Sequence, residues 1–205
     1  MNKAAFLAAV LLVTTGHVAN EAHAASVSKS YRYFSISGTT IEEIEADLAR
    51  RGPKVKATNA RHPGATQIEF KTRVTYGERN GRCGVHDVNV TAKAEVILPR
   101  WRRSARADAD TRLIWDVLAA DIKRHEEYHV TIARNYAREL ENTLKEIRNK
   151  AGCDRAQETV KAATATILER HDRAQERFDR VESINFEDRL QRLIRYRAEQ
   201  MPARR

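Results

Sequence analysis

The stretch LAADIKRHEEYHVTIARNYARELENTLKEIRNKAGC, residues 118–153, decides the fold of this chain, because it is a long amphipathic segment that ends at one glycine. Between Pro99 and the C-terminal Pro202, Gly152 is the only glycine, and no other proline occurs. Glycine and proline are the residues that most often end helices. The pattern therefore predicts that residues 101–201 form helices that fold back on each other at Gly152.

Both arms of this predicted helical hairpin carry an apolar stripe. Apolar or histidine side chains recur every three or four residues, which places them on one face of a helix. The first stripe consists of Leu118, Ile122, His125, His129, Ile132, Tyr136, Leu140, Leu144 and Ile147. The second consists of Val160, Ile167, His171, Ala174, Phe178 and Val181. We expect these faces to be buried, and two histidines lie on the first.

Residues 125–129 have the pattern His-Glu-x-x-His. Four residues are about one helical turn, so His125 and His129 project from one face and can share a metal ion, with Glu126 beside the open coordination position. Two core histidines without a shared partner would leave polar nitrogens unsatisfied, at a cost of about 1–3 kcal/mol each. The pattern therefore favours a Zn²⁺ site with Glu126 as general base over two hydrogen-bonded core histidines.

The third zinc ligand must come from elsewhere, because catalytic zinc usually takes three protein ligands and leaves one position open. With the turn centred near Gly152, residues 125–129 lie level with residues 175–179. Asp179 follows Phe178 of the apolar stripe, and we predict it as the third ligand. The alternatives that stay open are Glu182, Glu176 and His171.

Residues 31–100 predict a smaller part that contains strands and one helix. Tyr31 to Ile36 is an aromatic and β-branched run that is typical of a strand. The sequence from Thr40 to Glu43 has the form of a capping box, which predicts a helix that begins there and ends at Gly52-Pro53. This helix would bury Ile44 and its apolar neighbours.

Alternating apolar and polar residues predict two further strands, at residues 68–76 and 88–98. A two-residue turn at Asn80-Gly81 would place their apolar side chains on opposite faces of the sheet. We therefore predict a three-residue loop that begins at Arg79 and sets Phe70 against Val90. The alternate positions are polar, which predicts a sheet covered on one face only. These polar residues are Asn89, Thr91, Lys93 and Glu95.

The first 24 residues have the pattern of a signal peptide. Lys3 gives a positive start, and Ala4 to Val13 is an apolar run too short to span a bilayer. Ala22-His23-Ala24 then offers small residues at the two positions that signal peptidase recognises. We expect the mature chain to begin at Ala25, to act in the periplasm or outside the cell, and to contain no transmembrane segment.

Cys83 and Cys153 suit that location. A cysteine pair in an oxidising compartment is more often a disulfide than two free thiols. The bridge would close a loop of about seventy residues and remove about 4 kcal/mol of unfolded-state freedom. The alternative, a cysteine ligand to zinc, has less support because neither cysteine has a partner at zinc-finger spacing.

The chain is basic, with 37 Lys and Arg against 28 Asp and Glu and a net charge of +9. Outside the cytoplasm this charge favours anionic envelope polymers, lipid headgroups or acidic proteins as partners, and not nucleic acid. A solvated, arginine-rich helix surface would give the same composition. We predict residues 184–205 to be a basic C-terminal helix or tail, solvated or frayed rather than bound to a membrane.

Several blocks in this order resemble a bacterial domain-of-unknown-function family whose members are described as predicted secreted Zn-dependent proteases. The resemblance runs from Tyr31 to Asp179. Its blocks are Ser37-Gly38-Thr39-Thr40, Arg51-Gly52-Pro53, Cys83, Leu98-Pro99-Arg100-Trp101, the His-Glu-x-x-His segment and Cys153. It implies a peptidase activity. The chain departs from the family late in the second long helix: members carry Tyr-Asp followed by Glu, Thr and His-Gly, whereas here Phe178-Asp179 is followed by residues 180–185, Arg-Val-Glu-Ser-Ile-Asn, without the His-Gly pair.

We therefore expect an α+β fold in one domain, residues 25–183. A small antiparallel sheet with one helix, residues 31–100, would pack on the long antiparallel helical hairpin, residues 106–183. The expected function is zinc-dependent hydrolysis of peptide or protein substrates, with Tyr128 and Tyr136 as candidate oxyanion donors by chemistry alone. The alternatives are a non-catalytic envelope protein that binds anionic polymer or lipid, and a zinc carrier.

Overall fold

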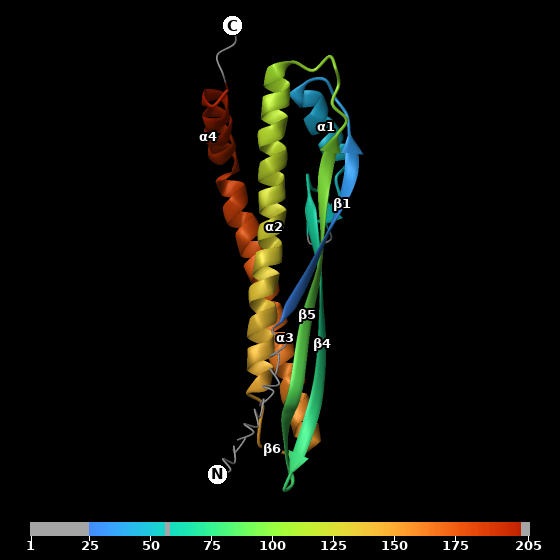
Figure 1. Ribbon diagram of the computed structural model, residues 1–205, viewed down its shortest axis with the longest axis vertical. Helices are drawn as coiled ribbons and strands as arrows, with labels where there is room; N and C mark the ends of the chain where they lie inside the picture. Colours follow the sequence, from blue (N-terminus) through green and yellow to red (C-terminus); the bar gives the residue numbers. More distant parts are fainter. Residues whose placement is uncertain (1–24, 56–57, 202–205) are drawn as a thin grey trace, which may run out of the picture.

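The computed structural model describes residues 25–55 and 58–201 (Figure 1). The predicted signal peptide, residues 1–24, lies outside the described residues. The described chain is a mixed α+β fold, as predicted, with an N-terminal sheet and helix α1 (Ile41–Arg51) followed by helices α2, α3 and α4. Helix α1 begins as its capping box predicts, because the Thr40 side chain accepts a hydrogen bond from the backbone N–H of Glu43.

The main sheet has the strand order β1-β5-β4, with β6 paired to the start of β5. The bounds are β1 Ser26–Ile36, β4 Ala65–Arg79, β5 Arg82–Trp101 and β6 Lys150–Ala151. Strands β2 (Lys54–Val55) and β3 (Ala60–Arg61) form a separate short pair. The prediction of an antiparallel sheet is wrong for β1, which runs parallel to β5. A parallel neighbour needs a crossover connection, and α1 lies within that connection.

The turn between β4 and β5 differs from the predicted three-residue loop. Arg79 pairs with Arg82, so the turn has two residues, Asn80 (φ 54°) and Gly81 (φ 69°). Both adopt the left-handed conformation that a type I′ hairpin turn requires. The register shifts further along, between Thr75 and Tyr76, whose partners on β5 leave His86 between them. Because of this bulge, the apolar residues of β4 and β5 lie on the same face of the sheet. Phe70 pairs with Ala92, not with Val90 as predicted.

Helix α2 (Ala109–Lys145) covers one face of the sheet, as Figure 1 shows along the length of β5. Side chains of β5 with even numbers from Val88 to Val96 are at most 3% exposed, while Lys93 on the other face is exposed. The prediction of a sheet covered on one face is confirmed. Leu118 and Ile122 of α2 pack in the same apolar cluster as Val96.

Helix α3 (Cys153–Ile184) begins directly after Gly152, and the connection from α2 contains two residues with positive φ, Asn149 (56°) and Gly152 (86°). The predicted disulfide is present: Cys83 and Cys153 are bonded, with their Cα atoms 5.0 Å apart. This bond attaches the start of α3 to β5. Helix α4 (Phe186–Glu199) follows, and its Leu190 packs against the core. In residues 25–55 and 58–201, no helix has the length and apolar character needed to cross a membrane.

Candidate metal centre

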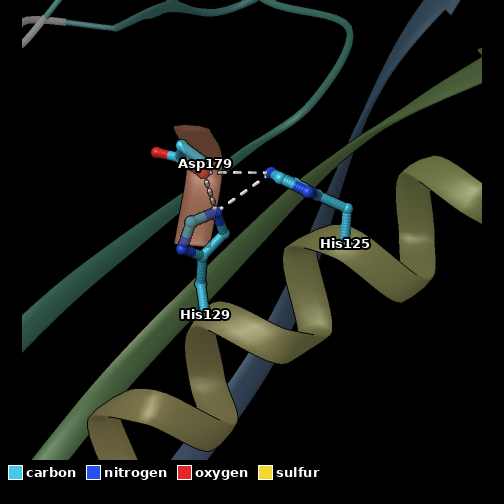
Figure 2. A group of neighbouring side chains, drawn as sticks. All are labelled: His125, His129 and Asp179. Carbon is cyan, nitrogen blue, oxygen red and sulfur yellow. Dashed lines mark hydrogen bonds and ion pairs between the residues drawn. The ribbon is translucent and has the colours of Figure 1, made fainter. Parts of the chain in front are cut away.

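His125 and His129 of α2 point toward Asp179 of α3, as Figure 2 shows. The Nε2 atoms of the two histidines are 3.1 Å apart. The Oδ1 atom of Asp179 lies 3.2 Å from Nε2 of His125 and 3.0 Å from Nε2 of His129. The contacts have the register expected for a turn at Gly152. Three donor atoms therefore form a nearly equilateral triangle across the two helices.

The size of this triangle suits a tetrahedral zinc ion. Zinc binds imidazole nitrogen and carboxylate oxygen at about 2.0–2.1 Å, which in tetrahedral geometry separates two ligand atoms by about 3.3 Å. The observed separations of 3.0–3.2 Å need only small side-chain rotations to reach that value. The donor set, two imidazoles and one carboxylate, is also one that zinc accepts in sites that keep a position open.

The protonation equilibria of the cluster reflect the same proximity. Burial works against a charged His129, but the hydrogen bonds that His129 donates to Asp179 and Gln175 outweigh it and raise the pKa of His129. Burial also disfavours the Asp179 carboxylate, but its hydrogen bonds to His125 and His129 outweigh that and lower the pKa of Asp179 well below its usual range. The site therefore favours a positive charge beside Asp179, held either as a proton or as a cation.

Gln175 fixes the orientation of the His129 ring. The Nδ1 atom of His129 lies 2.6 Å from Oε1 of Gln175. Because an amide oxygen only accepts, Nδ1 carries the hydrogen and Nε2 presents its lone pair to the cluster. The amide nitrogen of Gln175 donates to the backbone carbonyl of His129 at 3.2 Å and to Nε2 of His171 at 2.8 Å. This positioning role of Gln175 was not predicted from the sequence.

The alternative third ligands lie outside the triangle. His171 is buried behind Gln175, with its ring edge against Phe70, and its Nδ1 donates to Asp172. Glu182 lies on the far side of the His125 ring, 3.7 Å from Nδ1. Glu176 is exposed. Of the predicted candidates, Asp179 is the one that the structure brings to both Nε2 atoms.

Two arginines hold Glu182 behind His125. Arg189 of α4 binds Glu182 at 3.2 Å, and Arg124 of α2 binds the same carboxylate. Both arginines also bind the buried Asp121, which Arg189 contacts through two nitrogens. Helix α4 is thereby attached next to the site, and a carboxylate faces the ring nitrogen of His125 that points away from the metal position. Such a partner orients a histidine ligand and raises its basicity.

Glu126 is 5% exposed and lies between α2 and the start of β4. Thr66 donates hydrogen bonds to its Oε2 at 2.8 Å and to its backbone oxygen at 2.9 Å. Gly64 leaves the space for this side chain, because a Cβ atom there would lie 2.8 Å from Oε1 of Glu126. Burial raises the pKa of Glu126, although the nearby His129 and Thr66 act in the opposite direction.

A cleft of about 620 Å³ opens beside these residues. His125, Glu126 and Asp179 line one side, and the loop from His62 to Gly64 lines another. Arg180 and Phe186 also reach it. Tyr128 and Tyr136, the oxyanion candidates from the sequence, line a separate groove and are not placed to contact a group bound in this cleft.

Comparison with known proteins gives one family match. The family described as "Bacterial protein of unknown function (DUF922)" matches residues 31–186, a span that includes the triangle, Glu126 and both cysteines. No curated protein matches the chain, and no solved structure matches it either. The resemblance seen in the sequence is thus confirmed at the level of the family, while its description as a protease stays a prediction.

Proposed function

This chain belongs to the bacterial family of unknown function DUF922, and we propose that it is a zinc-dependent peptidase that acts outside the cytoplasm. One observation carries the proposal: Nε2 of His125, Nε2 of His129 and Oδ1 of Asp179 lie within 3.2 Å of one another at the edge of an open cleft. Three converging donors with an adjacent buried carboxyl group are the arrangement that metal-assisted hydrolysis requires.

The chemistry divides between the ion and the chain. A zinc ion held there would lower the pKa of water toward about 7 and polarise the scissile carbonyl. Glu126 would accept the proton of the attacking water and pass it to the leaving amine. Its raised pKa suits both steps, because a more basic carboxylate accepts a proton more readily near neutral pH.

Several contacts support this role for Glu126. The hydrogen bond from Thr66 restricts the carboxyl group to one orientation, and the absence of a side chain at Gly64 leaves room for Oε1 beside the loop. Gln175 restricts His129 in the same way. Fixed donors and acceptors need little reorganisation during the reaction, which is the main source of catalytic advantage in such sites.

The proposed location rests on the disulfide and on the pattern of the first 24 residues. Disulfides persist in oxidising compartments, and Cys83 and Cys153 are bonded. A basic start, a short apolar run and small residues before Ala25 are the features of an exported precursor. We expect Edman or mass-spectrometric analysis of the exported protein to find Ala25 at its N-terminus.

The activity is tested on the mature protein with and without the Glu126→Gln substitution. We expect one zinc per chain in both proteins by elemental analysis, because glutamine keeps the hydrogen bond to Thr66. We expect cleavage of casein or a peptide library by the wild type and a loss of about 10²–10⁴-fold in the variant. If the zinc-loaded wild type cleaves nothing under any condition, the peptidase function is refuted and a zinc carrier is favoured. Equal cleavage by both proteins would refute the role of Glu126.

Helix α4 supports a second candidate function, attachment to an anionic envelope component. No residue of α4 is fully buried, and Leu193 and Tyr196 are exposed together with Arg192 and Arg195. Exposed apolar and basic side chains on one helix favour binding to anionic lipid or polymer. Salt-sensitive binding to anionic vesicles by a protein that contains no zinc and cleaves no peptide would favour this function over hydrolysis.

A further inference from the structure

A groove separate from the cleft lies on the outer side of the α2–α3 pair. Aromatic side chains form its floor, and arginines from α3 form its rim. The ring of Tyr128 stacks on that of Phe178 with centroids 4.4 Å apart, and Tyr128 is 49% exposed. Further along, the guanidinium of Arg170 lies 5.9 Å from the centre of the Tyr136 ring. We call this surface the arginine groove.

The charge of the arginine groove is one-sided. Arg170, Arg173 and Arg177 lie on one face of α3 at helical spacing, and none of the residues that line the groove is acidic. Arg170 binds Glu139 and Arg173 binds Glu169, both outside the lining. For Arg177 no ion pair occurs among the described residues. The rim therefore carries three guanidinium groups, of which at least one has no compensating carboxylate.

The arginine groove shares a wall with the metal centre. The ring of Phe178 stacks on His125 with centroids 4.9 Å apart and meets His129 edge-on at 5.1 Å. The same ring also lines the arginine groove. Asp179 follows Phe178 directly and completes the triangle of donor atoms. The Phe178 ring, packed between His125 and Tyr128, therefore separates the arginine groove from the metal centre.

We propose that the arginine groove binds an acidic segment of a polypeptide substrate, away from the bond that is cleaved. The proposal rests on the peptidase function above and adds its substrate class. From Asp179, Arg177, Arg173 and Arg170 are about 3, 9 and 13.5 Å away along the helix axis at 1.5 Å per residue. Around the helix, however, Arg177 is about 200° from Asp179, so the arginines and Asp179 project from opposite sides of α3. A substrate held in the cleft therefore reaches the arginine groove with residues remote from the scissile bond.

The geometry favours a peptide over a membrane surface. The groove is lined by arginines of α3 and by the rings of Tyr128 and Tyr136 of α2, which present stacking surfaces to a narrow chain. Arginine guanidinium groups bind carboxylates through two parallel hydrogen bonds, and the aromatic floor accepts the aliphatic part of Glu side chains. Tyr128 and Val181 are exposed and line the groove, whereas Leu193 and Tyr196 are exposed on α4 and outside it.

The experiment measures binding by the zinc-loaded mature chain with Glu126→Gln, which prevents turnover. Fluorescein-labelled peptides of equal length carry Glu, Gln or Lys at three neighbouring positions, and anisotropy gives each Kd. The groove variant adds Arg173→Glu and Arg177→Glu. The matched control adds Arg192→Glu and Arg195→Glu on α4, which changes the net charge equally outside the groove. Circular dichroism melting checks that every variant is folded.

We expect the Glu peptide to bind about tenfold or more tightly than the Gln peptide, and the groove variant to lose that preference while the control keeps it within about twofold. The conservative variant Arg177→Lys should retain part of the preference. Equal losses in groove and control variants, or equal binding of Glu and Gln peptides, would overturn the proposal. Groove-dependent binding to phosphatidylglycerol vesicles but not to the Glu peptide would overturn it in favour of an anionic surface.

The two proposals fail separately. Binding in this assay requires no hydrolysis, so a preference for the Glu peptide in a protein that cleaves nothing would refute the peptidase function alone. Cleavage of Gln and Glu peptides at equal rates, abolished in the single variant Glu126→Gln, would refute the substrate class alone.

Discussion

The two halves of the α2–α3 pair are built from different chemistry. Next to the disulfide, Leu140 and Leu144 of α2 and Val160 and Ile167 of α3 are at most 8% exposed and share one apolar cluster. At the other end the helices meet through a polar cluster beside the stacked rings of Tyr128 and Phe178. The side chains of His129, His125 and Asp179 in that cluster are 12%, 26% and 55% exposed.

The contrast shows how a polar site can be held in place without a core of its own. Apolar burial contributes most of the stability of a domain, and the bond between Cys83 and Cys153 adds a constraint at the same end. The apolar end therefore sets the register of the two helices. The other end can then contain polar side chains that contribute little to packing but can bind a cation. Variants in one half should therefore change stability, and variants in the other should change metal affinity.

The largest expected effect comes from the disulfide. Replacement of both cysteines, Cys83→Ser with Cys153→Ser, should lower the free energy of unfolding by about 4 kcal/mol, because the unfolded chain gains the freedom of a loop of 70 residues. Urea denaturation measures the change. Zinc per chain should stay unchanged in the absence of urea. Loss of zinc in the folded double variant would show that the two halves are not separable.

A cavity in the apolar half should have a slightly smaller effect. Leu140 is fully buried, so Leu140→Ala should destabilise the protein by about 2–5 kcal/mol in urea denaturation. Its zinc affinity should equal that of the wild type. Leu193→Ala, at an exposed site on α4, is the control and should change stability by less than about 0.5 kcal/mol. A cavity variant with much weaker zinc binding would contradict the division.

Variants in the polar half should change zinc affinity and not stability. Gln175→Leu removes the acceptor for Nδ1 of His129, so the ring is no longer held in the binding orientation. Zinc affinity, measured by competition with a chromogenic chelator, should fall about 10–100-fold. Gln191→Leu on α4 is the matched control and should leave the affinity unchanged. Equal affinities of the two variants would remove Gln175 from the description of the site.

The smallest expected effect is a pH dependence. Without metal, the raised pKa of His129 stabilises the fold below its unfolded value of about 6.5, and this contribution is lost as pH rises through the folded pKa. The lowered pKa of Asp179 stabilises the fold above its unfolded value of about 3.9, and this contribution is lost as pH falls through the folded pKa. Both contributions are therefore present between about pH 4 and 6.5.

With zinc bound, the stability of the fold should no longer fall as the pH rises above about 6, because metal binding must displace the His129 proton and is favoured at higher pH. Melting temperatures with chelator should fall from about pH 6 to pH 8, and the gain on adding zinc should increase over the same range. Melting temperatures that follow the same pH profile with and without zinc would exclude His129 as a ligand.

The sequence predicts much of the candidate site because its information is local. The His-Glu-x-x-His pattern fixes the relative positions of His125, Glu126 and His129 once a helix is assumed. Asp179 follows from counting residues on either side of Gly152. Gln175 and Glu182 are harder, since their roles depend on side-chain rotations between helices and on Arg189 of a third helix. Such contacts leave no fixed spacing in the sequence.

For the fold, too, local sequence patterns predict some features and not others. Alternation in β4 and β5 predicts that a two-residue turn would set the apolar faces wrongly, and that argument is correct. The alternation does not predict at which residue the register shifts to bring the apolar side chains onto one face. Asn80 tolerates the left-handed conformation, so the turn keeps two residues, and the extra residue is His86 in the bulge. The direction of β1 is also undetermined by local pattern, because it depends on the crossover path through α1.

The most direct measurement is the zinc affinity of the mature protein with Asp179→Ala, compared with Glu176→Ala on the same helix. The account predicts one zinc per chain in the wild type and in Glu176→Ala, and an affinity about 100-fold weaker in Asp179→Ala, because two histidines alone leave the tetrahedral set incomplete. A wild-type chain that binds no zinc, or an Asp179→Ala variant that binds it as tightly as Glu176→Ala, would contradict the account.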